Sequence, residues 1–271
     1  MEFEYIDAHG HLNDKAFDGD REQQKAELLE LNIATIVIGT DVVMNEKAIA
    51  LANPEEGRYA VIGQHPSDGH PEIFDNDRYR AWAKLPEVVA IGECGLDYFW
   101  PQAGDWSGDE KKEKFRQYHL FAEQIDIARA VDKPLMIHGR PTKGTMDAYE
   151  DIIAQLKEAS RAPGPEIRGN AHFFAGDIAI AKEFLDLGFT CSFTGVLTFS
   201  SDYDEVVRYM PKESILAETD APYVAPKPYR GKRNESKYVR EVYAAIARIR
   251  GEDPEVMRRQ INMNAKKFFA I

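Results

Sequence analysis

The chain has 271 residues, 44% of them hydrophobic, and a formal net charge of −12. This composition is ample for a large core, and the length suits one (β/α)8 barrel, which typically needs about 250 residues. The acidic balance argues against a protein that grips nucleic acid through a broad basic face, because phosphate neutralisation by Lys and Arg supplies most of that affinity. An enzyme that meets one or two phosphates locally is not excluded.

Short apolar runs and helical patterns alternate along the whole chain. The expected strands are Phe3–Asp7, Ile33–Thr40, Tyr59–Gln64, Val88–Glu93, Pro134–His138, Arg168–His172, Phe189–Thr194 and Ser214–Thr219. The expected helices are Asp20–Leu31, Val42–Ala52, Asp75–Lys84, Asp109–Val131, Thr145–Ser160, Ile178–Leu187, Tyr203–Tyr209, Ser236–Arg250 and Pro254–Phe269. Such alternation predicts a parallel sheet covered by helices.

About eight such units favour a closed TIM barrel of the α/β class, with residues 1–271 as a single domain. A doubly wound open sheet is the alternative, but no Gly-x-Gly-x-x-Gly or P-loop sequence supports its nucleotide-binding form. Cys94 and Cys191 lie in apolar runs without Cys-x-x-Cys spacing, so we expect small buried residues rather than a disulfide.

The beginning of the chain is acidic and lacks the profile of a signal peptide. No run approaches the ~18 apolar residues that a membrane span needs. We therefore expect a cytoplasmic protein without a membrane partner, and nothing in the sequence indicates an obligate protein partner.

Histidines gather where the predicted strands end. In a barrel of this type, functional residues lie at the carboxyl ends of the strands. Of the seven histidines, only His70 and His119 lie elsewhere. The strand-end residues of interest are His9, His11, His65, Glu93, His138, His172 and Asp220. His9 and His11 are two apart, so in an extended chain both imidazoles can face one point.

Imidazoles and carboxylates together are ligands suited to Zn, Mn, Mg or similar divalent ions. His9, His11 and Asp220 come from strands 1 and 8, which are neighbours in a closed barrel, and we expect them to hold one ion. His138 and His172, from strands 5 and 6, would hold a second.

Glu93, from a strand between the two histidine groups, is the expected bridge. Two ions ~3.5–4 Å apart could hold a hydroxide between them, and a metal can lower the pKa of bound water to about 7. Asp220 could also serve as general base. Taken singly, each histidine could instead be a hydrogen-bonded strand-end residue, and Glu93 or Asp220 a helix cap or a salt-bridge partner.

Several blocks resemble the TatD family of metal-dependent deoxyribonucleases. They are Asp7-Ala8-His9-Gly10-His11-Leu12, Gly63-Gln64-His65-Pro66, Ile91-Gly92-Glu93-Cys94-Gly95-Leu96-Asp97-Tyr98, Pro134-Leu135-Met136-Ile137-His138-Gly139-Arg140, His172-Phe173-Phe174-Ala175-Gly176, Glu218-Thr219-Asp220-Ala221-Pro222-Tyr223 and Asn264-Ala265-Lys266-Lys267-Phe268-Phe269. The resemblance spans nearly the whole chain. It implies an amidohydrolase-like TIM barrel, metal ions on the six ligands His9, His11, Glu93, His138, His172 and Asp220, and removal of nucleotides from a DNA end.

This sequence departs from the family pattern beside the expected ligands. Asn13 stands where the family usually has Asp, and Gly139 where it has Ser. Pro141-Thr142 replaces Asp-Ala, and Phe173-Phe174-Ala175 replaces Cys-Phe-Ser. No expected ligand is lost, so these changes bear on the residues around the metals and on the substrate.

Substrate contacts are predicted from position. Arg140 follows His138 by two residues and can reach the same opening to bind a phosphate bidentately. Arg230 and Lys232, with Arg233, form a basic cluster in the loop after strand 8. A solvated loop is the alternative role for this cluster. His65 could donate to a phosphate oxygen or be a further metal ligand.

Aromatic residues follow strand 4. Tyr98, together with Phe99, Trp100 and Trp106, could stack on a base, an interaction worth ~1–3 kcal/mol. Packing of the loop against the barrel is the alternative role for these rings.

We expect a metal-dependent hydrolase that cleaves phosphodiesters, a DNA exonuclease acting on single-stranded ends, with Asp220 and Glu93 as catalytic residues. One alternative keeps the site and changes the substrate, giving an amidohydrolase-like enzyme for a small ester, lactone or amide. A second alternative is a non-catalytic metal-binding module, although structural metal sites more often use cysteine-rich cages.

Overall fold

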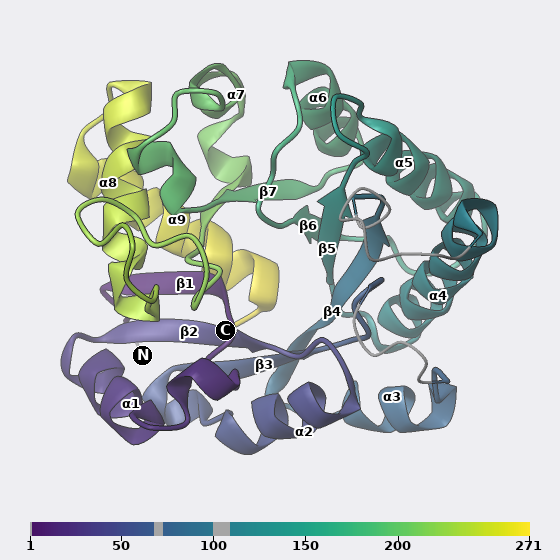
Figure 1. Cartoon of the computed structure of the whole chain (residues 1–271), viewed down its shortest axis with the longest axis horizontal. Coiled ribbons are helices and arrows are strands. Elements are labelled where there is room, and N and C mark those ends of the chain that lie inside the picture. The colour runs from purple at the N-terminus through teal and green to yellow at the C-terminus, as the bar shows by residue number, and fades with distance from the viewer. Residues whose placement is uncertain (1, 68–72, 100–108) are drawn as a thin grey trace.

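The computed structural model describes residues 2–67, 73–99 and 109–271. One parallel sheet of eight strands runs in chain order from β1 to β8, and the helices lie outside it (Figure 1). The predicted TIM barrel is therefore confirmed. The strands are β1 Tyr5–Gly10, β2 Ile33–Ile38, β3 Arg58–Ile62, β4 Val88–Asp97, β5 Leu135–Arg140, β6 Gly169–Ala171, β7 Thr190–Phe193 and β8 Ile215–Ala217.

The helices agree with the sequence prediction to within two residues at most ends. They are α1 Arg21–Glu30, α2 Val42–Leu51, α3 Asn76–Trp82, α4 Glu110–Val131, α5 Asp147–Ser160, α6 Ile178–Asp186, α7 Asp204–Tyr209, α8 Val239–Arg250 and α9 Pro254–Phe269. Short 3-10 helices include η1 Lys15–Phe17 and η6 Ser236–Tyr238, which leads into α8. Many starts are fixed locally, since an aspartate before α2, α3, α4, α6 and α9 accepts backbone N–H groups. Among the described residues, no helix combines the length and hydropathy that a membrane span requires.

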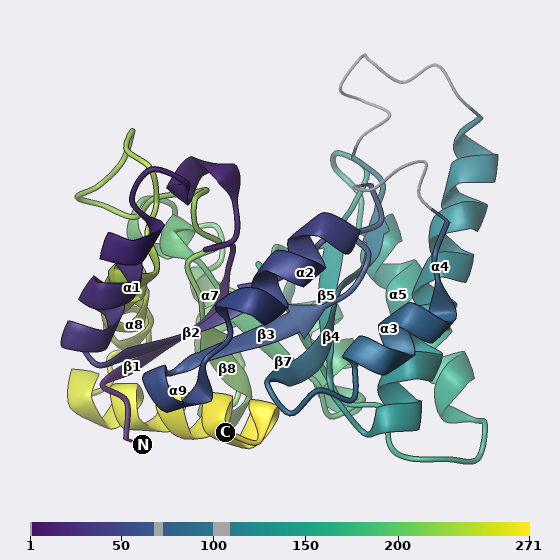
Figure 2. The same ribbon diagram turned by 90° about the horizontal axis from the view of Figure 1, so that it is seen from below.

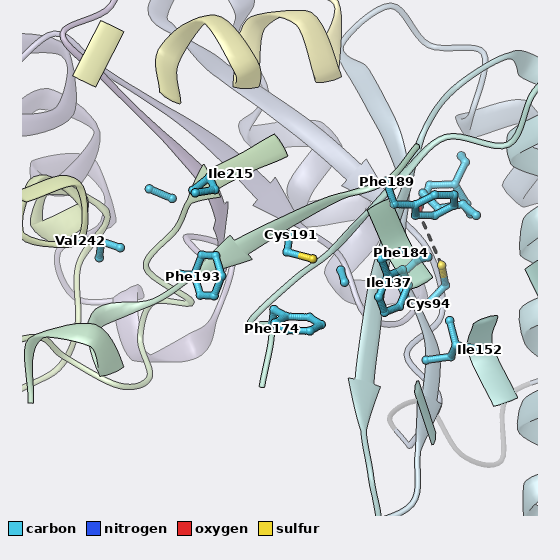
Figure 3. Packing of buried hydrophobic residues seen from close by; sticks show 14 of the residues in the cluster. Cys94, Ile137, Ile152, Phe174, Phe184, Phe189, Cys191, Phe193, Ile215 and Val242 are labelled. Atoms are coloured by element: carbon cyan, nitrogen blue, oxygen red, sulfur yellow. Dashed lines mark hydrogen bonds between the residues drawn. The ribbon is translucent and has the colours of Figure 1, made fainter. Parts of the chain in front are cut away.

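Each strand is buried on both faces, as β2 illustrates. Ala34, Ile36 and Ile38 pack inside the barrel, whereas Ile33 and Val37 belong to the larger cluster between the sheet and the helices. Figure 3 shows part of that larger cluster, where residues of β5, β7 and β8 meet those of the surrounding helices. Inward and outward residues therefore alternate along the strands, as the pleat of a β-strand requires.

The last helix closes one end of the barrel. Ala265 and Phe269 of α9 join Phe3 and Ile6 in the apolar cluster inside the barrel. Figure 2 shows α9 lying across this end, beneath the starts of the strands. We call this the amino end, and the opposite end, where the strands finish, the carboxyl end.

The barrel closes between its first and last strands at the carboxyl end. The backbone N–H of His11 donates to the carbonyl of Ala221 over 2.7 Å, and that of Asp220 donates to the carbonyl of His9 over 2.9 Å. Closure therefore brings the first block of the chain beside residues more than 200 positions later.

Candidate metal centre

The six expected ligands meet at the carboxyl end of the barrel. Five of them are at least nine-tenths buried and His138 is half-buried. Above them opens a cavity of about 880 Å³. His11, Glu93, His138, His172 and Asp220 lie in its lining, and His9 is fully buried beneath them.

Two strands reach this arrangement only through irregularities in their pairing. Ile6 and Ala8 of β1 face the barrel interior, so strict alternation would turn His9 outward. The register of β1 with β2 shifts between Asp7 and Gly10, and this shift turns His9 toward the centre.

A second register shift occurs in β4. Its register with β5 shifts between Ile91 and Cys94, and Glu93 lies at that point. Close contact accompanies the shift. Gly95 has a φ of 131°, and an added Cβ would lie 2.1 Å from the carbonyl oxygen of His138. Glycine is therefore required beside Glu93, because any side chain would push β4 away from β5.

Regular alternation is enough in the later strands. Met136 of β5 and Leu216 of β8 point into the barrel. The two-residue period of a strand then places His138 on the inner side after Met136, and Glu218 on the inner side after Leu216. Asp220 lies beyond the end of β8, so this alternation does not set its direction. Asp220 itself has a φ of 53°, a left-handed conformation that is uncommon away from glycine, and its short polar side chain tolerates it.

The first group of ligand atoms is compact. The two Nε2 atoms of His9 and His11 lie 3.3 Å apart. Oδ1 of Asp220 is 3.4 Å from Nε2 of His11, and Oε2 of Glu93 is 3.5 Å from Nε2 of His9. Ligands about 2.1 Å from a tetrahedral ion lie about 3.4 Å from one another. These side chains therefore fit a divalent cation without rearrangement.

A second group shares Glu93. Its Oε1 lies 2.9 Å from Nδ1 of His138 and 2.8 Å from Nε2 of His172, and these two nitrogens are 3.4 Å apart. Oε1 and Oε2 of Glu93 thus face different histidine pairs, as a bridging carboxylate must. Nε2 of His65 is a further 3.5 Å neighbour of Oε1.

The buried carboxylates of the cluster require compensating positive charge. Burial opposes ionisation of Glu93, yet His172 and His65 hold the pKa of its carboxyl well below the usual value. Burial disfavours a proton on His138, but the carboxylates of Asp97 and Glu93 raise its pKa to about 9. Burial and the neighbouring His172 lower the pKa of His9, which leaves its imidazole neutral. Either protons or metal ions must compensate these buried carboxylates.

Two carboxylates outside the six predicted ligands lie beside histidines. Oδ2 of Asp97 is hydrogen-bonded to Nε2 of His138 over 3.1 Å. Oε1 of Glu218 lies 3.4 Å from Nδ1 of His172 but forms no hydrogen bond with it in this structure. Such carboxylate–histidine pairs fix the ring and raise its basicity as a ligand. Sequence reasoning missed both residues. The two-residue period would have found them, since Asp97 follows Glu93 by four positions and Glu218 follows the inward-facing Leu216 by two.

A buried hydrogen-bonded pair ties β1 to the segment after β8. The carboxylate of Asp7 accepts the backbone N–H of Thr219 over 2.8 Å and its hydroxyl over 2.7 Å. Burial raises the pKa of Asp7 to about 7, although its hydrogen bonds with Ser236 and Thr219 oppose the rise. This pair fixes the relative position of the neighbouring His9 and Asp220.

Of the expected substrate contacts, two line the cavity. His65 lies in its wall with Nδ1 bonded to Ser67. Arg140 is exposed in the wall, with its guanidinium 3.9 Å from the ring centre of Phe99. Both side chains are therefore within the same opening as the candidate ligands.

The other expected contacts lie away from the cavity lining. Arg230 and Lys232 are exposed in the loop after β8, and the guanidinium of Arg230 lies 4.0 Å from the ring centre of Phe199. Tyr98 is 2% exposed and donates a 2.9 Å hydrogen bond to Asp151. Trp100 and Trp106, which were also candidates for stacking on a base, lie outside the described residues.

Among the cavity residues that were not singled out from the sequence are two cations and two aromatic rings: Lys15, Lys47, Phe173 and Tyr223. Tyr223 and Phe173 stood in motif blocks that carry ligands, three residues after Asp220 and one after His172. Their closeness in sequence to an expected ligand could have indicated that they line the cavity. Lys15 and Lys47 lie on η1 and α2, and no motif marked them.

The chain is similar to several known proteins. A sequence profile described as TatD related DNase matches residues 6–270. The chain is 35% identical to the Bacillus subtilis uncharacterized metal-dependent hydrolase YabD, over 98% of this chain and 99% of that protein. It is 32% identical to the Mycobacterium tuberculosis uncharacterized metal-dependent hydrolase TatD, over 98% of each. The crystal structure of Escherichia coli YjjV, a TatD homologue, matches the whole of both chains with a TM-score of 0.83 and 26% identity.

Proposed function

The chain belongs to the TatD-related DNase family of metal-dependent hydrolases, and on this premise we propose that it cleaves phosphodiester bonds near the ends of single-stranded DNA. Two divalent ions, Mg, Mn or Zn, would be held by His9, His11 and Asp220 on one side and by His138 and His172 on the other. Glu93 would bridge them.

One observation carries this proposal. The two carboxylate oxygens of Glu93 face two separate histidine pairs at distances that suit a shared ion on each side. A lone structural ion would not need this division, nor a cavity above it. Both features support our proposal of an open hydrolytic site for two ions.

The protein groups divide the chemical work. Bound divalent ions supply Lewis-acid stabilisation of phosphate charge and lower the pKa of water. Asp220 accepts the proton of the attacking water, and we assign this role to Oδ2, because Oδ1 is the oxygen nearest to both His9 and His11. Arg140, exposed in the cavity wall, neutralises charge on the phosphate.

The size of the cavity supports a large substrate. At about 880 Å³ it lies in the upper part of the ~300–1,000 Å³ range of ligand sites. A small ester or lactone would leave most of this volume to water. A polynucleotide end would place several groups against the walls.

The experiment measures turnover of end-labelled single-stranded DNA by the metal-loaded protein in Mg, Mn and Zn, with Asp220→Asn as the test variant. We expect a product ladder from the wild type and none from Asp220→Asn. Asp126→Asn, at an exposed position of α4, is the matched control and should cleave normally. Full activity of Asp220→Asn, or a wild type that prefers small esters over oligonucleotides, would contradict the proposal.

A further inference from the structure

The cavity carries aromatic and cationic side chains in addition to the candidate metal ligands. Among the described lining residues, Phe173 and Tyr223 are the aromatic rings other than histidine, and Lys15, Lys47 and Arg140 are the cations. Building on the proposed function, we infer that these five residues form a binding site for unpaired nucleotides, with bases stacked on the two rings and flanking phosphates beside the cations.

Tyr223 is a rigid platform with an accessible ring. Its side chain is 55% exposed, and its ring stands edge-on to His11 at 6.2 Å between centres. Its backbone is held firmly, because its N–H donates to the carbonyl of Asp220 over 2.8 Å and Asn234 donates to its own carbonyl over 2.6 Å. An exposed ring on a fixed backbone can bind a base with little loss of conformational freedom.

Phe173 provides the second ring. Its backbone takes a left-handed φ of 44°, and its N–H donates to the buried Glu218 carboxylate over 2.7 Å. That conformation is unfavourable for a residue with a β-carbon, so the hydrogen bond is what holds the half-buried ring in the cavity wall.

The two rings contact different histidines of the candidate metal centre. Tyr223 neighbours His11, whose ring is 5.1 Å from that of His9. His9 in turn stacks on His172 at 3.9 Å, and Phe173 is 6.5 Å from His172. A strand whose phosphate lies over the centre can therefore place one base against each ring.

The cations complete the site. Lys15 and Lys47 are exposed, and no ion pair joins either of them, or Arg140, to another residue in the described part of the chain. The nearby carboxylates of Asp14 and Asp41 instead accept backbone N–H groups at the starts of η1 and α2. The three cations are therefore available to phosphates.

Stacking of this kind distinguishes single strands from duplexes. In a duplex each base face is covered by its neighbours, whereas an unpaired base can turn a face to a protein ring. The inferred site therefore predicts a preference for single-stranded substrate with little dependence on base sequence, because every base has such a face.

The test compares KM and kcat of the metal-loaded protein for an oligothymidylate and for the corresponding thymidylate–adenylate duplex, in the wild type, Tyr223→Ala and Tyr223→Phe. We expect Tyr223→Ala to raise KM for the single strand about 5- to 150-fold and to leave the duplex nearly unchanged. Tyr223→Phe keeps the ring and should behave as the wild type. Tyr209→Ala, with a 43% exposed tyrosine on α7, is the control.

The cations are tested by salt dependence. Replacing a phosphate contact on a single strand should reduce the slope of log affinity against log salt by about 0.7. We expect this for Lys47→Gln, measured by fluorescence anisotropy of a labelled oligothymidylate. Lys267→Gln, exposed on α9 at the amino end, should leave the slope unchanged.

The outcomes separate this inference from the proposed function. An unchanged ratio of single-strand to duplex KM in Tyr223→Ala overturns the inference, while continued cleavage of DNA upholds the proposed function. A wild type that cleaves neither DNA nor methyl p-nitrophenyl phosphate overturns the proposed function. Anisotropy then still decides the binding site, and equal affinities of wild type and Tyr223→Ala for oligothymidylate overturn it.

Discussion

The two ends of the barrel bury opposite kinds of side chain. At the amino end, Phe3, Ile6 and Phe269 form a dry apolar plug beneath α9. At the carboxyl end, imidazoles and carboxylates such as His9 and Glu93 are buried just as completely. Burial of apolar surface stabilises the fold by about 25 cal/mol per Å². Burial of charge destabilises it unless each charge is compensated.

This contrast separates stability from function along one set of strands. Leu216 packs in the interior cluster, and two residues later the same face of the chain carries Glu218. We therefore expect substitutions at the amino end to change the free energy of unfolding, and those at the carboxyl end to change metal binding and turnover. Three variants and metal removal test this division, and a fourth variant tests a surface ion pair, in order of expected effect.

Glu93→Ala should have the largest effect. It removes the carboxylate that both histidine groups share, so we expect kcat/KM to fall more than about 10³-fold, beyond the loss that a single electrostatic donor causes. Metal analysis of the purified variant should show reduced occupancy. A variant that retains full metal content and activity would remove Glu93 from the centre.

Phe269→Ala tests the amino end. The side chain is 3% exposed, and loss of a buried Phe costs about 3–5 kcal/mol of unfolding free energy. We expect this loss in denaturant titrations, with kcat/KM of the remaining folded protein unchanged.

Removal of metal by a chelator tests whether the two ends of the barrel contribute to stability independently. Removal of metal should destabilise the wild type and Phe269→Ala equally, by about 2.7 kcal/mol where the ion had been at 100 times its Kd. Unequal losses would show that the two ends are coupled.

Asp97→Asn should have an intermediate effect. The carboxylate that orients His138 would be replaced by an amide, and loss of such a partner lowers metal affinity about 10- to 100-fold. Titration of the metal-free protein by calorimetry measures this directly. An affinity equal to the wild type would show that Asp97 has no role in holding the ring.

Asp20→Asn should have the smallest effect. Arg233 pairs with Asp20 and lowers its pKa to about 2. Because the folded-state pKa is below the unfolded one, the pair stabilises the protein above about pH 4, and this contribution is lost as pH falls toward 2.

The pair is only partly buried, so solvent screens it and we expect a loss of at most about 1 kcal/mol at pH 7. The difference between wild type and Asp20→Asn in denaturant midpoint should shrink as pH falls from 5 to about 3. A difference that grows on acidification would contradict the assignment.

The sequence by itself predicted the eight strand–helix units, the bounds of most helices and the strands that carry histidine. These features are local, because apolar periodicity and aspartate caps depend on neighbouring residues. It also predicted that Glu93 and Asp220 lie among these histidines, because the carboxyl ends of barrel strands share one end.

Only the tertiary structure decided how those side chains are aimed. The sequence ended the first strand at Asp7 and the fourth at Glu93, whereas β1 continues to Gly10 and β4 to Asp97. The register shifts that turn His9 and Glu93 inward depend on pairing with β2 and β5, which no local pattern encodes.

The direction of Tyr98 was decided in the same way. The sequence left two roles open for it, stacking on a base or packing against the barrel; in the structure its hydroxyl reaches Asp151 on α5 and Lys114 of α4 covers its ring. Those partners come from helices distant in sequence. Packing between distant elements, rather than the composition of the loop, therefore determined which aromatic residues line the cavity.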